Sequence, residues 1–399
     1  MLRFLTAGES HGPQLTAVIE GLPAGMTVDP ERINEQLARR QKGYGRGSRM
    51  KIEKDQVRIL SGVRGCLTLG GPVTLVIDNL DWANWSEIMD PIKPIPEQLG
   101  LKLDRLAHDT TKPRPGHADL AGGIKYNHHD LRNVLERASA RETAARVAVG
   151  SLARQFLELF NIQLASHVVR IGSVAVETPP DLKDLAAFSR TVEQSEVRCA
   201  DEAVALCMME AIREAKKERD SLGGVIEVIL RGLPIGLGSY VHWDRRLDSR
   251  LAAAVMSIPS VKGVEIGDGF LSAGRPGSEV HDQIYYSDSP APARKQFTRT
   301  TNSAGGLEGG VTNGEDVVIR AAVKPISTLN KPLATVDVLT KKAAEAMVER
   351  ADTCVVPAVG VIAEAMAALV LADAFMEKFG SDNMIEIERH YRAYLDAAY

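Results

Sequence analysis

The sequence predicts an α+β fold with antiparallel sheets, arranged as one domain of two related halves. Strand-like and helix-like segments are mixed along the 399 residues, and hairpin signals such as Asn313-Gly314 favour antiparallel pairing. A strand followed by a Gly-Leu-Pro turn occurs at 18–23 and again at 229–234, and each half ends in an apolar helix. We therefore predict a single domain over 1–399, with internal halves at about 1–160 and 222–380. Chance similarity between strand-turn-helix units is the alternative interpretation.

Local signals place the elements of both halves. Asp29 and Pro30 form the clearest helix start, as N-cap and first helical residue. The apolar helix near 355–375 contains Glu364 and Asp373, which predicts a core helix and not a membrane span. Strands are predicted at 2–6, 15–20, 56–63, 73–78 and 223–230. Helices are predicted within 112–160 and at 244–256, and a strand with two helices within 162–221. Between the strands and these helices, residues from about 82 to 111 are predicted to form an irregular excursion.

Composition and absent motifs exclude several functions. A net charge of −4 and a pI of about 6.2 argue against general nucleic-acid binding, which needs a basic face. The four cysteines are far apart and form no CxxC pair, which is typical of reduced thiols in a cytosolic protein. No Rossmann, P-loop or HExxH motif occurs, so neither a nucleotide site of those kinds nor a metal site is predicted. The N-terminus shows no signal peptide, and we expect a cytoplasmic protein.

Residues 112–160 indicate a binding site for a multiply anionic small molecule. Small residues separate the cations there, as in Pro115-Gly116-His117 and in residues 137–141, Arg-Ala-Ser-Ala-Arg. Small neighbours let a ligand approach the backbone while long arginine side chains reach in from the rim. The cationic and imidazole side chains of this stretch are Arg114, His117, His128, His129, Arg132, Arg137 and Arg141.

Two histidines are candidates for proton transfer. His11 lies in a glycine-flanked loop, GESHG at 8–12, directly after a strand; it is either held for catalysis or a surface residue. His117 follows Arg114 by three residues, and the Pro-Gly turn between them is expected to direct both toward one space. Asp119 either caps the next helix or orients this imidazole.

Further segments could bind phosphate or carboxylate groups. Arg40 and Arg46 flank a glycine-rich loop that is either a solvated basic loop or an anion clamp. Ser139 either meets a ligand or only caps the long helix that follows it. The glycines within 302–310 predict close approach of a planar or phosphorylated ligand, and Lys324 with two hydroxyls up to Thr328 forms a candidate phosphate cradle. Residues 350–354 have a surface salt bridge as their simplest interpretation.

Taken together and in order, these motifs resemble the chorismate synthase family over nearly the whole chain. The motifs are GESHG at 8–12, the Arg40/Arg46 loop, RPGHAD at 114–119, RASARET at 137–143, SAGGLEGG at 303–310, KPIST at 324–328 and RADTC at 350–354. The resemblance implies a β-α-β sandwich, with helices between antiparallel sheets, that assembles as a homotetramer. The excursions at about 82–111 and 275–299 are similar to those of longer members and could serve subunit contacts or a lid.

The resemblance also implies an activity: a carbon–oxygen lyase of aromatic amino acid biosynthesis, at the last common step of the shikimate pathway. Its reaction is the anti-1,4-elimination of phosphate and a ring proton from 5-enolpyruvylshikimate 3-phosphate, giving chorismate. The cofactor classes associated with the family are flavins, FMN and FAD, and NADP, and the reaction itself needs reduced FMN. NADPH would matter only if the protein reduced its own flavin; an external flavin reductase is the other source of electrons.

Residue roles are implied position by position. His11 matches the histidine that protonates reduced flavin, His117 the general acid near the departing phosphate, and Asp352 the aspartate that assists transfer of the ring proton. The implied cofactor contacts are Arg137, Ala138, Ser139, Pro259, Ser260, Gly309, Lys324, Pro325, Ile326, Ser327, Thr328 and Arg350. The implied substrate or NADP contacts are Arg40, Arg46, Arg114 and Arg141. Ala138 stands where many members have serine, which puts one flavin hydrogen bond in doubt.

Two competing interpretations follow from the same residues. One is a flavin-dependent reductase or another phosphoester lyase on the same scaffold, and the other is a non-catalytic protein that binds phosphorylated metabolites. A reductase would consume NADPH, whereas a binding protein would never turn over its ligand.

Overall fold

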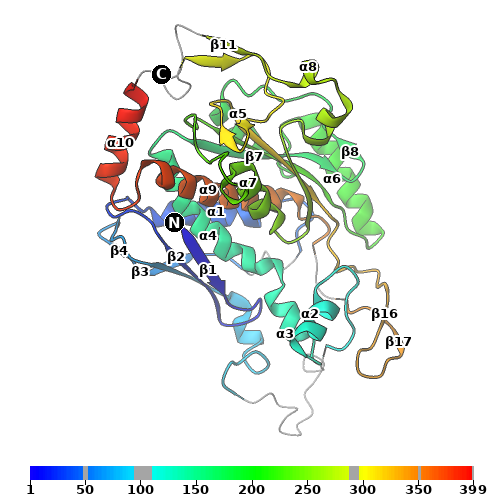
Figure 1. Cartoon of the computed structure of the whole chain (residues 1–399). Coiled ribbons are helices and arrows are strands. Elements are labelled where there is room, and N and C mark those ends of the chain that lie inside the picture. Colours follow the sequence, from blue (N-terminus) through cyan, green and yellow to red (C-terminus); the bar gives the residue numbers. More distant parts are fainter. Residues whose placement is uncertain (48–52, 94–109, 287–295, 349–351, 398–399) are drawn as a thin grey trace.

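Two antiparallel sheets enclose a layer of helices, as predicted (Figure 1). The computed structural model describes residues 1–47, 53–93, 110–286, 296–348 and 352–397. The first sheet has the order β1-β2-β6-β3, formed by Arg3–Ala7, Gln14–Glu20, Val73–Asp78 and Val57–Ser61. The second has the order β10-β15-β9-β7-β8, formed by Val261–Ile266, Val317–Val323, Gly224–Arg231, Gln163–Ile171 and Val174–Ala175.

Alternation along the strands gives each sheet one face toward the helix layer. In β2, Leu15, Ala17 and Ile19 are buried while the residues between them are partly exposed. In β15, Val317, Ile319, Ala321 and Val323 are buried in the same way. The central helices are α1 (Pro30–Gln41), α4 (Thr143–Glu158), α7 (Leu247–Met256) and α9 (Val356–Phe379).

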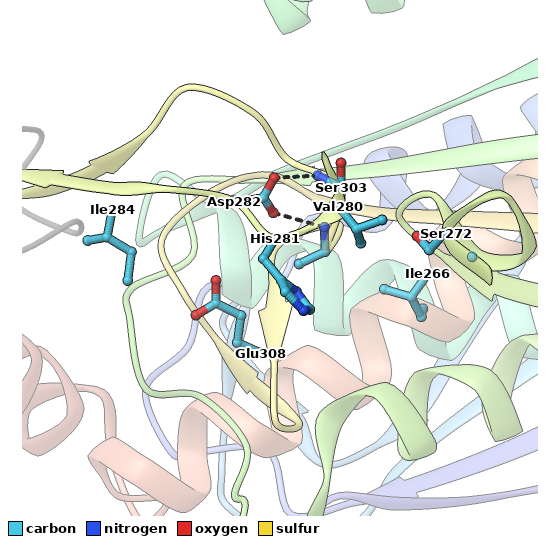
Figure 2. Close-up of a pocket in the computed structure, with 10 residues that line it drawn as sticks. Ile266, Ser272, Val280, His281, Asp282, Ile284, Ser303 and Glu308 are labelled. Atoms are coloured by element: carbon cyan, nitrogen blue, oxygen red, sulfur yellow. Dashed lines mark hydrogen bonds between the residues drawn. The ribbon is translucent and has the colours of Figure 1, made fainter. Parts of the chain in front are cut away.

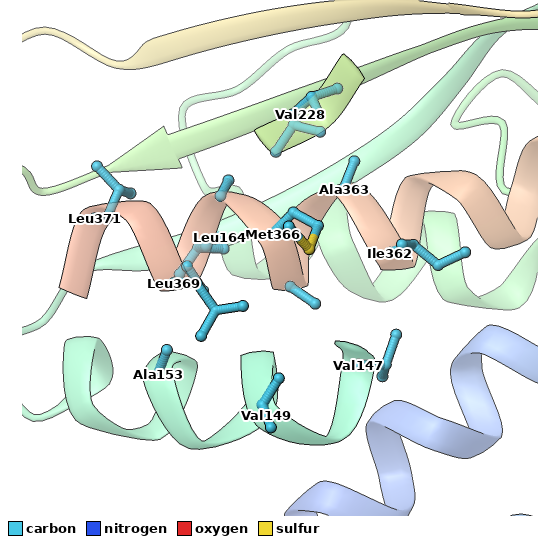
Figure 3. Packing of buried hydrophobic residues seen from close by; sticks show 14 of the residues in the cluster. Val147, Val149, Ala153, Leu164, Val228, Ile362, Ala363, Met366, Leu369 and Leu371 are labelled. Carbon is cyan, nitrogen blue, oxygen red and sulfur yellow. The ribbon is translucent and has the colours of Figure 1, made fainter. Parts of the chain in front are cut away.

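Helices α4 and α9 form the centre of the core. Figure 3 shows Val147 and Val149 of α4 below Ile362 and Met366 of α9, with Val228 of the second sheet above. The backbones come so close that a Cβ at Gly150 would lie 2.4 Å from the Cβ of Ala365. Helix α9 is apolar and long enough to cross a membrane, but 89% of its most apolar window is buried inside the protein. It is therefore a core helix.

Smaller elements surround this sandwich. Helix α5 (Leu185–Gln194) covers the outer face of the second sheet, where Phe188 and Val192 pack with Ala165 and Ile229. The other helices are α2 (Asp119–Tyr126), α3 (Arg132–Arg137), α6 (Glu202–Lys217), α8 (Gly277–Val280) and α10 (Met384–Asp396), with 3-10 turns η2 (Leu80–Asn84), η4 (Ala140–Glu142), η5 (Trp243–Arg245) and η6 (Gly269–Gly274). The short hairpins are β4–β5 (Val63–Arg64, Leu67–Thr68), β11–β12 (Ile284–Tyr286, Phe297–Arg299), β13–β14 (Leu307–Glu308, Val311–Thr312) and β16–β17 (Ala334–Val336, Ala343–Glu345).

Most predicted elements are present, with two local differences. Asp29 caps α1 by accepting a hydrogen bond from Glu31 N, with Pro30 at the first helical position. The sequence predicted a hairpin turn at Asn313-Gly314. In the structure the hairpin is formed by β13 and β14, and its turn is made by Gly309 and Gly310, with φ of +60° and +84°. The helix predicted from 137 begins with the 3-10 turn η4, and α4 starts only at Thr143.

The strand orders of the two sheets correspond. The order β7-β9-β15-β10 in the second sheet follows the same chain sequence of elements as β1-β2-β6-β3 in the first. Two threonines also make matching hydrogen bonds to the two Gly-Leu-Pro turns. Thr68 Oγ1 donates to Pro23 O and accepts from Met26 N, while Thr312 Oγ1 donates to Pro234 O and accepts from Leu237 N.

Candidate active site

A cavity of about 720 Å³ is lined by loop residues from distant parts of the chain and by the first turns of α9. It brings together most of the site residues predicted from the sequence. These are His11, Arg40, Arg46, Arg114, His117, Ala138, Ser139, Arg141, Pro259, Ser260, Lys324, Ile326, Ser327, Thr328 and Asp352. Segments as far apart in the sequence as 10–11 and 352–362 thus share one cavity.

Three predicted residues of the described chain do not line this cavity. Arg137 is exposed and donates hydrogen bonds to Thr6 O and Gly8 O, behind the GESHG loop. Pro325 lies between lining residues, and Gly309 lies in the β13–β14 turn beside Tyr240. Arg350 lies outside the described residues.

His11 is oriented by a carboxylate. Its Nδ1 lies 2.9 Å from both carboxylate oxygens of Glu136, and its backbone N–H donates to the same side chain at 2.9 Å. The ring of Trp85 stacks on the imidazole, with ring centroids 3.9 Å apart. Burial alone would raise the pKa of Glu136, but hydrogen bonds from His11 hold that pKa below its ordinary value. His11 is therefore a fixed residue of the cavity wall and not a surface residue.

His117 is oriented by a second carboxylate. Its Nδ1 lies 2.5 Å from Asp119 Oδ1, and Arg114 donates to Asp119 from both its backbone N–H and its side chain. Although burial opposes it, hydrogen bonds from His117 and Arg114 lower the pKa of Asp119 well below its usual range. Asp119 is the first residue of α2 and does not cap it, so the capping interpretation is wrong and the orienting one is confirmed.

Arg40 and Arg141 share one buried carboxylate. Asp55 accepts from Arg40 Nη2 at 2.7 Å and from Arg141 Nη1 at 2.5 Å, and Arg141 Nε donates to Asn79. Burial outweighs the attraction of Asp55 and lowers the pKa of Arg40 to about 10, so the guanidinium stays charged at neutral pH. The two arginines are thereby held rigidly against the cavity, which excludes the solvated-loop interpretation for Arg40.

The glycine-rich loop is attached to the segment before α9. Arg46 Nη1 lies 3.0 Å from Asp352 Oδ2, and Gly47 N donates to Asp352 Oδ1 at 2.5 Å. Thr353 N donates to Gly45 O. Since the side chains of Arg46 and Asp352 are only 10% and 19% exposed, this ion pair belongs to the cavity and is not a surface salt bridge.

Cations outnumber carboxylates on the wall of this cavity. Among the described lining residues, Arg40, Arg46, Arg114, Arg141, Lys262 and Lys324 are cationic, whereas Asp81 and Asp352 are acidic. Lys324 Nζ donates to Gly116 O, and burial together with nearby Lys262 lowers the pKa of Lys324. Ser139 caps η4 through Arg141 N and also lines the cavity, so both of its predicted roles are compatible.

A second hollow of about 450 Å³ suits a multiply anionic ligand less well. Figure 2 shows it beside the hairpin that contains Ile284, with His281 and Glu308 on its wall. The Asp282 carboxylate there accepts hydrogen bonds from the backbone N–H groups of Ser303 and Ala304. Its described lining includes two carboxylates and no lysine or arginine, so it is not the anion site.

Sequence reasoning missed several residues of the site, including the apolar wall from the start of α9 and four polar or aromatic residues. Trp85 comes from the excursion after β6, Glu136 and Asp55 bind the predicted side chains from behind, and Lys262 follows Ser260 on β10. No motif indicated the two carboxylates, since Glu136 is 125 positions from His11, and Asp55 is 15 and 86 positions from Arg40 and Arg141.

Comparison with known proteins shows the family of this chain. A family model described as chorismate synthase matches residues 2–376. A relative named chorismate synthase from Geobacter metallireducens is 55% identical over 402 residues, covering 99% of both chains. Another from Bacillus subtilis is 53% identical over 389 residues, covering 98% of this chain and 97% of the relative. A solved structure described as chorismate synthase is 42% identical with a TM-score of 0.75, covering 99% and 97% of the two chains. The chain therefore belongs to the chorismate synthase family.

Proposed function

We propose that the cavity of about 720 Å³ is the site at which this chain carries out the reaction of its family. That reaction eliminates phosphate and a ring proton from 5-enolpyruvylshikimate 3-phosphate to give chorismate, in aromatic amino acid biosynthesis. The chain is accordingly a carbon–oxygen lyase. One observation carries the location: two carboxylate-oriented histidines face a cavity whose described wall holds six cationic side chains.

The charge of the wall matches the charge of the substrate. The substrate carries one phosphate and two carboxylates, and arginine binds both groups with paired hydrogen bonds. Arg40 and Arg141 are fixed by Asp55, and Arg114 is fixed by Asp119, so their orientation is established before a ligand arrives. We assign phosphate and carboxylate binding to these arginines together with Arg46.

The residues present also fit a flavin. An apolar wall from the start of α9, formed by Val355, Ala358, Val359 and Ile362, lies beside the hydroxyls of Ser260, Ser327 and Thr328. An apolar surface with a few polar groups is what a planar ring with a phosphate tail requires. Bound reduced FMN would supply electron density for the departure of phosphate. We retain Arg137, Pro325, Gly309 and Arg350 as proposed flavin contacts from the family pattern.

The histidines and Asp352 are assigned to proton transfer. Because Nδ1 of His117 is engaged by Asp119, its Nε2 is the atom that would donate a proton to the departing phosphate. Because Nδ1 of His11 faces Glu136, Nε2 is the atom through which His11 would exchange a proton with a ligand. The Asp352 carboxylate, paired with Arg46, is assigned to transfer of the ring proton.

An anaerobic assay with chemically reduced FMN and 5-enolpyruvylshikimate 3-phosphate tests this function. Chorismate absorbance and released phosphate should appear in equal amounts without net oxidation of the flavin. In the same assay with NADPH and oxidised FMN in place of reduced FMN, stoichiometric NADPH consumption without chorismate would favour the reductase. Tight binding of the phosphate ester with no product, in a folded protein that binds FMN, would favour the metabolite-binding protein.

The assembly and location of the chain are further proposals. We infer a cytoplasmic homotetramer, supplied with electrons by its own flavin reduction with NADPH or by an external reductase. Exposed aromatic side chains support an assembly, among them Tyr240 at 78%, Trp243 at 71% and Phe270 at 85% exposure. Light scattering at micromolar concentration would decide the oligomeric state.

We also propose that the two halves arose by duplication. The matching strand orders and the equivalent hydrogen bonds of Thr68 and Thr312 support this origin. The hydrogen bonds pair Thr68 with Thr312, and thus the β4–β5 hairpin with the β13–β14 hairpin. A superposition of the two sheets by these pairs would test the proposal.

A further inference from the structure

His11 is held by contacts that no sequence motif indicates. Glu136, on α3, accepts hydrogen bonds from the backbone N–H of His11 and lies against its Nδ1, all at 2.9 Å. The Glu136 backbone carbonyl also accepts from Ser10 N at 3.0 Å. One fully buried residue, 125 positions away in the sequence, therefore fixes both the GESHG loop and its imidazole.

The face of the imidazole is covered from another element. Trp85 follows η2, is only 8% exposed, and stacks on His11 with an interplanar angle of 24°. Its Nε1 donates to Asp81 at 3.3 Å, and the guanidinium carbon of Arg132 lies 5.2 Å from the Trp85 ring. Arg132 also approaches Glu136 at 3.4 Å. The indole is thus fixed at its edge and on its face, so it can hold the imidazole plane in place.

These contacts decide which ring nitrogen reaches the cavity. A carboxylate beside Nδ1 requires the proton on that nitrogen, as it does where an aspartate orients a catalytic histidine. Among the described residues, the ring of His11 is hydrogen-bonded only through Nδ1. Nε2 then remains for a ligand, either as acceptor or, in the imidazolium, as donor.

We propose that Glu136 and Trp85 are positioning residues, which hold His11 with a proton on Nδ1 and with Nε2 directed into the cavity. The proposal rests on the proposed function, since it assigns no chemistry to His11 beyond proton transfer there. It gives the start of the excursion after β6 a role inside the active site. Among the described charged groups around this imidazole, Glu136 contacts the ring itself, Arg132 contacts Glu136, and Asp81 contacts Trp85.

Glu136→Gln separates positioning from packing. The introduced amide can keep the hydrogen bond from the His11 backbone while its NH₂ group donates to Nδ1, which moves the imidazole proton to Nε2. Nitrogen-15 NMR of histidine-labelled protein reads this tautomer without any ligand, and a His11→Gln spectrum identifies the signal. We expect the Nδ1–H form in the wild type and the Nε2–H form in Glu136→Gln. An Nε2–H form in the wild type would overturn the proposal.

Kinetics provide an independent readout. With reduced FMN, we expect Glu136→Gln to lower kcat by roughly 10- to 100-fold, a part of what general acid catalysis contributes, with little change in the substrate KM. The pH profile of kcat should also change, because the amide alters which ring nitrogen of His11 carries the proton. An unchanged kcat and pH profile would overturn the proposal. Absence of product in the wild type would instead refute the proposed function, and the NMR result would still stand.

The chain offers a matched control. Glu227 is a second buried glutamate beside a histidine and an arginine: it lies 3.1 Å from His167 Nε2 and accepts from Arg320 Nε at 2.7 Å, outside the cavity. Glu227→Gln should lower the melting temperature but leave kcat and its pH profile unchanged. If both variants lost the same fraction of kcat, Glu136 would be only structural.

Two substitutions of Trp85 test the stacking. Trp85→Phe keeps an aromatic face and should retain kcat within a few fold, whereas Trp85→Leu should lose about tenfold. Equal kcat in both variants would remove Trp85 from the proposal. A far-ultraviolet circular dichroism spectrum identical to the wild type shows that each variant is folded.

Discussion

Asp119 Oδ1 lies 2.5 Å from Nδ1 of His117, and the same carboxylate accepts three hydrogen bonds from Arg114. One buried acid therefore fixes both a proposed proton donor and a proposed anion-binding side chain. Asp119→Asn should reverse the His117 tautomer, since the amide can donate to Nδ1. We expect kcat with reduced FMN to fall by about 10²- to 10⁴-fold.

The control for this variant is Asp316→Asn. Asp316 pairs with Arg231 outside the cavity, so its removal should leave kcat unchanged. The orienting role of Asp119 is refuted if its variant keeps full activity at saturating substrate.

Asp55 is expected to be essential for stability because it neutralises Arg40 and Arg141 inside the protein. Asp55→Asn leaves two buried guanidinium groups with a weaker partner, and we expect a loss of about 3–5 kcal/mol in the free energy of unfolding. Urea denaturation measures it. Asp78→Asn is the control, because the Asp78–Arg58 pair is more than half exposed and should contribute at most about 1 kcal/mol. Similar losses in the two variants would contradict the argument.

The buried carboxylate of Glu364 should make the stability of the protein depend on pH. It is buried in α9 and bound by Arg39, Arg154 and Arg198, whose charges, against the effect of burial, lower the pKa of Glu364 far below its usual range. A carboxyl whose pKa is depressed by folding contributes stability that is fully present above its unfolded pKa, about 4.3, and is lost as the pH falls toward the folded value.

Glu364→Gln should therefore be destabilised at pH 7 by about 3–5 kcal/mol, and this difference from the wild type should shrink as the pH falls below about 4. Denaturant unfolding of both proteins between pH 7 and pH 3 measures the difference. A constant difference over that range would contradict the assignment.

The close approach of α4 to α9 at Gly150 leaves no room for a larger side chain at that position. A Cβ there would lie 2.4 Å from the Ala365 Cβ and 2.7 Å from its backbone, so the helices must separate in Gly150→Ala. We expect a loss of about 1–3 kcal/mol, measured by thermal unfolding. Gly71→Ala meets no atom within 4 Å and should change stability by less than about 0.5 kcal/mol. A neutral Gly150→Ala variant would show that this contact is not tight.

Local chemistry made much of the fold predictable. The alternation of Leu15, Ala17 and Ile19 and the Asp29-Pro30 helix start depend on neighbours in the sequence, and both are present in the structure. The apolar run around Glu364 predicted a core helix, but not the three arginines that surround this glutamate. Those partners come from α1, α4 and the segment after α5, and only the fold brings them together.

The residues of the active site likewise divide into those that the sequence predicted and those that only the fold brings together. Residues that would touch a ligand stand in recognisable motifs, and the cavity brings most of them together. The residues behind them, Asp55 and Glu136, are 86 and 125 positions from their partners Arg141 and His11, so no spacing rule indicates them. Gly309 shows the opposite case, since it stands in a motif yet lies outside the cavity of its own chain.

The most direct test of the account is single-turnover chemistry in the two histidine variants. His11→Ala and His117→Ala are mixed anaerobically with reduced FMN and 5-enolpyruvylshikimate 3-phosphate, and chorismate and phosphate are followed together, with FMN binding measured separately. We predict equal amounts of both products in the wild type, a rate at least about 100-fold lower in each variant, and retained FMN binding. Unchanged rates in both variants would show that neither histidine takes part in the chemistry, which would contradict the roles assigned to them.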